Sequence, residues 1–148
     1  MQYRFPRWEQ LPQIALYMDQ VLLVLNQVLD PLSSDGTAIT ATMINNYVKM
    51  KLAPPAEKKK YDRAHMARFL MICLMKKVLS MAEIAAILDR LLQSDTLEES
   101  YDRFCTELER RLEALDGADS ADCPAILAAV LRAVACKIHV EKMIQISA

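Results

Sequence analysis

The sequence of 148 residues contains only two glycines, Gly36 and Gly117. A phosphate-binding loop or a dinucleotide-binding fingerprint needs several glycines at fixed spacing, so the enzyme classes built on those motifs are excluded. The four cysteines form no CxxC pair, and the two histidines, His65 and His139, are far apart in the chain. This is unlike the ligand spacing of zinc sites. We therefore expect neither a metal nor a cofactor.

Long hydrophobic runs are also missing. The longest unbroken apolar stretches, such as residues 69–75, are far shorter than the roughly 18 residues that a membrane span needs. Residues 1–12 carry two arginines but no following apolar run, which is unlike a secretory signal. We expect a cytoplasmic protein without membrane contact, in which Cys73, Cys105 and Cys136 pack inside helices as free thiols.

Apolar residues make up 53% of the chain and charged residues 25%, which is enough apolar surface for a packed core. Almost every segment repeats its apolar residues at helical spacing, and none alternates at period two. The sequence therefore predicts an all-α helical bundle, with residues 1–148 forming a single domain. In the first helix, at about 13–29, apolar residues cover so much of the circumference that we expect it to be central to the core.

Capping residues place the later helices. The predicted spans are about 41–50 after Thr40, about 63–78 after Asp62, about 81–93 after Ser80, about 97–115, and a last helix from Asp122 to about 146. The best candidate boundary is at 117–122. The apolar faces of the last helix are too wide for water. We therefore expect residues 97–148 to form a C-terminal helical pair whose last helix packs on its neighbour or on a second subunit, as a homodimer contact.

The near-zero net charge hides a division along the chain. Residues 49–77 hold nine basic against two acidic residues, a net +7, whereas residues 83–122 hold four basic against twelve acidic residues, a net −8. A basic surface beside an acidic one is expected where one face meets a polyanion, and nucleic acid is the leading candidate. The alternative is that the lysine run at 58–60 is a solvated loop.

Several short motifs lie in and around the basic segment. Residues 43–47 read MINNY, 51–55 read KLAPP, Tyr61 and Asp62 follow the lysines, and 79–84 read LSMAEI. In this order they resemble the DNA-binding half of the MerR-type transcription regulators, over residues 39–92. The resemblance implies a short recognition helix, then a wing, then a helical pair.

The departures from that family are specific. Asn45 replaces an arginine that grips phosphate in the family, Lys51 replaces a glycine, and the wing is shorter. The family's short first helix is also replaced by a long apolar helix and a polar loop before Thr40. Nearly the whole chain further resembles a bacterial family of domains of unknown function, which implies no activity.

The residues themselves support DNA binding. In a helix that begins after Thr40, Ile44, Tyr47 and Val48 share one side and the polar residues share the other. Amide side chains can read adenine edges in the major groove, while lysine and the tyrosine hydroxyl can hold phosphates. The predicted contacts to double-stranded DNA are Thr42, Asn45, Asn46, Tyr47, Lys49, Lys58, Lys59, Lys60, Tyr61 and Arg63. The alternative is that the two asparagines only solvate the helix and the two tyrosines fill the core.

No nucleophile, base or metal set stands at a recognisable spacing, so we do not expect an enzyme. His65 is next to the basic loop and is expected to support a phosphate contact or the helix start, and His139 is expected to pack. Two hypotheses remain. The first is a DNA-binding transcriptional regulator with a MerR-like helix-turn-helix. The second is a helical protein–protein interaction module that binds no nucleic acid.

Overall fold

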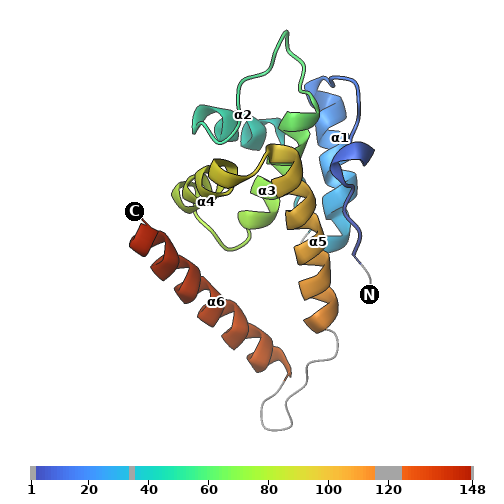
Figure 1. Cartoon of the computed structure of the whole chain (residues 1–148). Coiled ribbons are helices and arrows are strands. Elements are labelled where there is room, and N and C mark those ends of the chain that lie inside the picture. Colours follow the sequence, from blue (N-terminus) through green and yellow to red (C-terminus); the bar gives the residue numbers. More distant parts are fainter. Residues whose placement is uncertain (1–2, 34–35, 116–124, 148) are drawn as a thin grey trace.

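The computed structural model describes residues 3–33, 36–115 and 125–147. Over these residues the chain is helical and forms only isolated β-bridges, so the all-α prediction is confirmed (Figure 1). The elements are the short 3₁₀ helices η1 (Trp8–Gln10) and η2 (Asp30–Leu32) and the α-helices α1 (Met18–Leu29), α2 (Ala41–Lys49), α3 (Arg63–Met75), α4 (Met81–Ser94), α5 (Leu97–Leu115) and α6 (Ala125–Ser147). None of the described helices is both long and apolar enough to cross a membrane.

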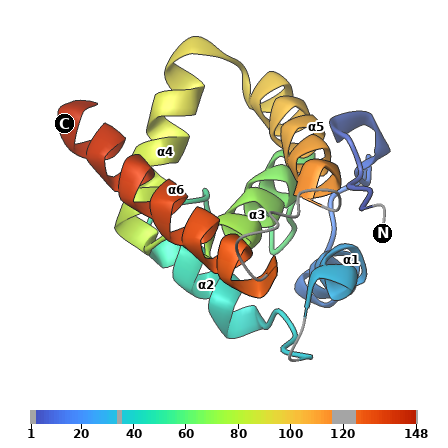
Figure 2. The ribbon, with the colours of Figure 1, turned by 90° about the horizontal axis from the view of Figure 1, so that it is seen from below.

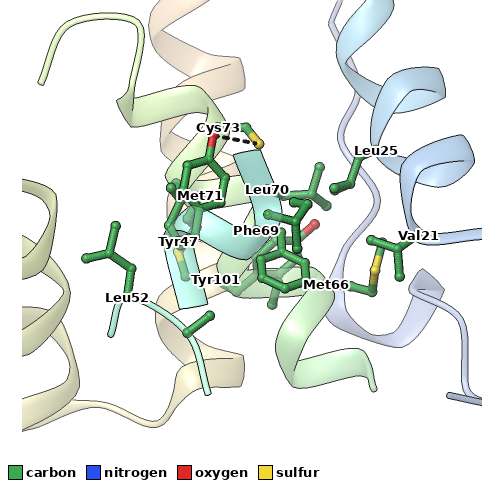
Figure 3. Packing of buried hydrophobic residues seen from close by; sticks show 14 of the residues in the cluster. Val21, Leu25, Tyr47, Leu52, Met66, Phe69, Leu70, Met71, Cys73 and Tyr101 are labelled. Atoms are coloured by element: carbon green, nitrogen blue, oxygen red, sulfur yellow. Dashed lines mark hydrogen bonds between the residues drawn. The ribbon is translucent and has the colours of Figure 1, made fainter. Parts of the chain in front are cut away.

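The central helix of the fold is α3, which packs against α1 and α5. It is apolar around most of its circumference, and nine of its thirteen residues are buried. In α1 only Val21 and Leu25 are buried, while Leu23 is 61% exposed. Figure 3 shows Val21 and Leu25 facing the core residues of α3. The prediction that the first helix is central is therefore wrong, because α1 lies on the surface and buries one side only.

The first helix is also shorter than predicted. Leu16 and Tyr61 exchange two backbone hydrogen bonds of 2.8 Å, which hold the chain extended up to Tyr17. A residue in a bridge of this kind has no free backbone groups for a helical turn, so α1 begins only at Met18. The predicted caps of later helices are confirmed: the side chains of Thr40, Asp62 and Ser80 accept hydrogen bonds from the first turns of α2, α3 and α4.

Residues 3–11 are fixed to α5 through a buried carboxylate. Glu109 is 6% exposed and accepts hydrogen bonds from Arg7 Nη1 at 2.6 Å, Arg7 Nη2 at 3.1 Å and the backbone N–H of Phe5 at 3.1 Å. Arg4 adds a contact of 3.3 Å. These bonds, chiefly the one from Arg7, hold the pKa of Glu109 below its usual value. The N-terminal segment is therefore part of the packed fold.

The last helix, α6, stands apart from the bundle and touches it along α4. Figure 2 shows α6 crossing beneath the bundle with its C-terminal half beside α4. An ion pair joins the two helices, with Lys137 Nζ at 2.7 Å from Glu83 Oε1. The predicted burial of thiols is confirmed for Cys73 and Cys105 and wrong for Cys136, which is exposed because α6 has little cover. The predicted boundary at 117–122 and the cap at Asp122 lie outside the described residues.

Candidate nucleic-acid interface

The exposed face of α2 carries the polar residues that the sequence placed there. Ile44 and Tyr47 are buried against α3, which turns the opposite side of this nine-residue helix to solvent. The exposed residues of that side are Thr42, Asn45, Asn46 and Lys49. Two side-chain amides and an ammonium group therefore lie on one open helix face.

The end of α2 is a Schellman turn built on a lysine. Leu52 N–H donates to the Tyr47 carbonyl at 2.9 Å, and Lys51 N–H donates to the Val48 carbonyl at 3.0 Å. Lys51 has φ 63°, in the left-handed region where this turn usually has glycine. Lys51 therefore adopts the backbone conformation that is usual for glycine at this position and adds a positive charge at the end of α2.

A two-residue hairpin follows between α2 and α3. Glu57 and Lys60 exchange backbone hydrogen bonds of 2.9 and 3.0 Å, with Lys58 and Lys59 at the tip. Their φ angles are 52° and 64°, the type I′ combination that normally selects Asn-Gly. Both tip lysines are exposed, and Figure 1 shows this connection projecting beyond the helices. The pairing of Leu16 with Tyr61 extends the hairpin on its inner side.

Backbone strain in the described chain is concentrated in this connection. Apart from Gly36, the described residues with positive φ are Lys51, Lys58 and Lys59. The left-handed conformation costs a residue with a Cβ roughly 1–2 kcal/mol. Asparagine and glycine adopt the type I′ turn at a lower conformational energy than lysine. Strained backbone of this kind clusters at functional sites. Three charged side chains are thus held where stability alone favours glycine or asparagine.

Replacing the tip by the residues that suit its geometry, Lys58→Asn with Lys59→Gly, is expected to stabilise the protein. The relief of two left-handed lysines exceeds the added chain entropy of one glycine, for a net gain of about 1–2 kcal/mol. The midpoint of thermal unfolding, followed by circular dichroism, should rise by a few degrees. Lys58→Ala with Lys59→Ala is the matched control, since it removes the same charges and keeps the strain. An unchanged or lower midpoint in the Asn-Gly variant would show that the turn is unstrained.

A buried histidine fastens the hairpin to the start of α3. His65 is 5% exposed, and its Nε2 lies 3.1 Å from the Pro55 carbonyl, so Nε2 carries a proton and donates. Its Nδ1 lies 3.1 Å from the backbone nitrogen of Asp62 and 2.8 Å from Asp62 Oδ1. The expected role of His65 at the helix start is confirmed. Arg68 Nη1 holds the other side of the connection by donating to the Leu52 carbonyl at 3.2 Å.

The structure adds one exposed aromatic residue to the predicted set. Lys60 Nζ lies 5.1 Å from the centroid of the Tyr17 ring, within cation–π distance, and Tyr17 is 51% exposed. Sequence reasoning missed Tyr17 because the periodicity assigned it to the first helix, whereas it precedes α1 beside the hairpin. Its hydroxyl is a further group that can reach a phosphate next to Lys60.

Three predicted contact residues are not open to a ligand. Tyr47 is 2% exposed and its hydroxyl pairs with Cys73 Sγ at 3.9 Å (Figure 3), and burial raises its pKa well above the usual value. Tyr61 is 7% exposed and meets Phe69 edge-on, so both tyrosines pack in the core, as the alternative interpretation held. Arg63 is half-buried, and its Nη2 donates to the Leu11 carbonyl at 3.3 Å. An aromatic ring beside α3 gains more from burial than from a single phosphate contact.

The open surface therefore combines one helix face with one hairpin. Its members are Thr42, Asn45, Asn46, Lys49, Lys51, Lys58, Lys59, Lys60 and Tyr17. Most of its charges are positive, with Glu57 at the base of the hairpin as an exposed acidic neighbour. In the described part of the chain no group of three or more histidine, cysteine or acidic side chains could hold a metal ion. The arrangement suits a long anionic partner more than a small substrate.

Fold and surface together define an all-helical domain with a basic helix-and-hairpin face. Residues 6–104 match the model of DUF1836, a domain of unknown function, and the chain belongs to this family. No curated protein and no solved structure matches the chain. The matched region contains the whole basic surface and ends inside α5, so α6 lies outside it.

Proposed function

We propose that this protein is a DNA-binding transcriptional regulator whose α2 and 57–60 hairpin form a MerR-like helix-turn-helix with a short wing. The observation that carries the proposal is the set of left-handed lysines Lys51, Lys58 and Lys59. Each retains a cation at a backbone position that favours glycine or asparagine, so the charge itself must be useful. A solvated loop gains nothing from a lysine in a strained position.

In this proposal α2 lies in the major groove and the hairpin follows the backbone beside it. Asn45 and Asn46 supply the amide groups that pair with adenine N6 and N7. The Thr42 hydroxyl can hydrogen-bond to a donor or to an acceptor on a base edge. Lys49, Lys51 and the hairpin lysines neutralise phosphates and fix the register of α2. His65 and Arg68 act as positioning residues, because they hold the segment that leads from α2 into the hairpin through the Pro55 and Leu52 carbonyls.

The proposal includes a homodimer formed through α6. The large side chains Leu127, Leu131, Val134 and Ile138 follow one stripe of this helix, and each is 45–54% exposed. Their spacing of four, three and four residues reads the same in both directions. An antiparallel copy of α6 therefore places Leu127 against Ile138 and Leu131 against Val134, twice over. A two-fold axis of this kind would present two α2 helices to paired half-sites.

The experiment that tests DNA binding is a salt titration on random duplex DNA. Wild type is compared with the variant Lys58→Ala, Lys59→Ala, Lys60→Ala by fluorescence anisotropy. Each phosphate contact contributes about 0.9 to the slope of log affinity against log salt, so the variant should lose roughly two to three units per bound subunit.

The matched control removes three arginines from α5, Arg103→Ala, Arg110→Ala and Arg111→Ala. These side chains are 64–73% exposed and lie outside the basic surface, so the net charge changes equally while the slope should stay at the wild-type value. Equal effects of the two triple variants would mean that binding follows net charge alone. Absence of DNA binding at low salt would remove the proposal and favour a protein-interaction module with an acidic partner.

A further inference from the structure

The ring of His65 joins the two arms of the connection that carries the 57–60 hairpin. Its Nε2 lies 3.1 Å from the carbonyl oxygen of Pro55, which precedes the hairpin, and its Nδ1 lies 2.8 Å from Oδ1 of Asp62, which follows it. The residue is 5% exposed, and its ring meets Tyr61 edge-on with 5.3 Å between the ring centroids. One buried side chain therefore bridges the chain that enters the hairpin and the chain that leaves it.

Both partners of this bridge are hydrogen-bond acceptors. A neutral imidazole has a single N–H, and Nε2 uses it for the Pro55 carbonyl, so the lone pair of Nδ1 faces the Asp62 carboxylate. At Nδ1 the neutral ring can instead accept from the backbone N–H of Asp62, whose nitrogen lies 3.1 Å away. An imidazolium ring donates from both nitrogens, and its bond to Asp62 is also an ion pair. The bridge is therefore complete only when the ring carries two protons.

Asp62 remains a carboxylate over the pH range in which histidines titrate. Burial alone would raise the pKa of Asp62, but the hydrogen bond from the backbone N–H of His65 and the contact with its ring outweigh burial and hold that pKa below its usual value. The acceptor at Nδ1 thus keeps its negative charge whether or not the ring has taken up its second proton.

The other charges near the ring lie in the hairpin. The charged residues that line the same pocket as His65 are Glu57, Lys58, Lys60 and Asp62. The segment before α1 adds the uncharged Ala15 to this pocket. On the helices packed against α3, Asp19 of α1 is exposed and the buried Glu109 of α5 is paired with Arg7. Asp62 is therefore the ionised group in hydrogen-bonding contact with the ring.

We propose that His65 is a pH-sensitive clip that fixes the 57–60 hairpin to the start of α3. Histidine is the side chain that ordinarily changes its charge between about pH 5 and 8. Uptake of a proton at Nδ1 in this range completes the bridge from Pro55 to Asp62 and holds the hairpin in one position relative to α2. The response of the hairpin is a property of the free protein, whereas its effect on DNA affinity rests on the proposed function.

Hydrogen exchange of the free protein tests the clip. The backbone N–H groups of Glu57 and Lys60 donate across the hairpin, so their protection against exchange reports how firmly it is held. After correction for the pH dependence of exchange itself, this protection should rise about three- to tenfold from about pH 7.5 to about pH 5.5, as expected for one added charge-assisted bond. The rise should follow the NMR signals of the His65 ring over the same range.

Variants locate the response. Asp62→Asn is decisive, because asparagine keeps the helix cap and removes the charge, and the rise in protection should then fall below about twofold. His65→Gln, which does not titrate, should show no rise. The matched control is His139→Gln, which removes an exposed histidine of α6 and should keep the wild-type response. Equal protection at both pH values in wild type, an undiminished rise in Asp62→Asn, or a response lost in His139→Gln would each overturn the clip.

DNA binding separates the clip from the proposed function. At constant ionic strength, the affinity for random duplex DNA should rise about threefold or more from about pH 7.5 to about pH 5.5 in wild type and in His139→Gln, and by less in Asp62→Asn. A hairpin response without DNA binding at either pH would remove the proposed function and leave the clip. DNA binding without a hairpin response would overturn the clip and leave the proposed function.

Discussion

Replacing Leu131 and Val134 together by glutamate is expected to dissociate the homodimer that we propose to form through α6. In the antiparallel pairing these two positions face each other twice across the two-fold axis, so four carboxylates would enter the apolar centre of the contact. Burial of unpaired charge costs several kcal/mol. At about 4 kcal/mol the dimerisation constant falls about a thousandfold, a change that sedimentation velocity across a concentration series detects directly.

The matched control places the same two charges on the far side of α6. Ala129 and Cys136 are exposed and lie about half a turn from the stripe, so Ala129→Glu with Cys136→Glu should leave the dimer intact. A wild-type protein that stays monomeric at about 100 μM, or a stripe variant that still dimerises, would contradict the pairing. On a duplex with two half-sites, loss of the dimer should also lower DNA affinity by about a hundredfold or more, because the second contact is no longer intramolecular.

The second large effect is expected at Glu109. Glu109→Ala should lower the free energy of unfolding by about 3 kcal/mol, because Arg7 loses its partner and the Phe5 N–H loses its acceptor in a buried place. The value is at the low end for buried pairs because the Arg7 side chain is 32% exposed. Urea unfolding followed by circular dichroism measures it. The control is Glu113→Ala, an exposed carboxylate on the same helix that pairs with Arg4 at 3.6 Å, with an expected change below about 0.5 kcal/mol.

Acid titration separates this role from a simple loss of packing. The pKa of Glu109 is lowered in the folded protein, so its contribution is fully present above the unfolded pKa near 4.5 and is lost as the pH falls through the folded value. Wild type should therefore lose its advantage over Glu109→Ala as the pH falls below about 4. A stability difference that stays constant from pH 7 to about pH 3 would show that the carboxylate charge contributes nothing.

Local signals in the sequence predicted the helices well. The caps at Thr40, Asp62 and Ser80 act within one turn of their own position, so they could be recognised without knowing the fold. Helical periodicity likewise placed Asn45 and Asn46 on a face opposite the buried side of α2. The candidate surface was therefore found in outline from the residues alone.

Non-local contacts explain what the sequence did not show. Helical periodicity assigned Tyr17 to the first helix. The bridge between Leu16 and Tyr61, which keeps the chain extended there, joins residues that are 45 positions apart and therefore leaves no local signal. Tyr47 and Tyr61 were assigned to DNA, since a tyrosine at helical spacing can point to solvent or to a core with equal ease. The left-handed lysines could not be foreseen, because lysine carries no local preference for positive φ.

The sequence by itself determined that this protein is helical, where most of its helices begin, which side of α2 is polar, and that its charge is divided along the chain. These properties depend on neighbours within a few residues. Only the tertiary structure decided that α3 and not α1 is central, that two tyrosines turn inward, and that the apolar stripe of α6 stays open. Periodicity shows that a face is apolar, but what covers that face depends on distant elements and on their packing.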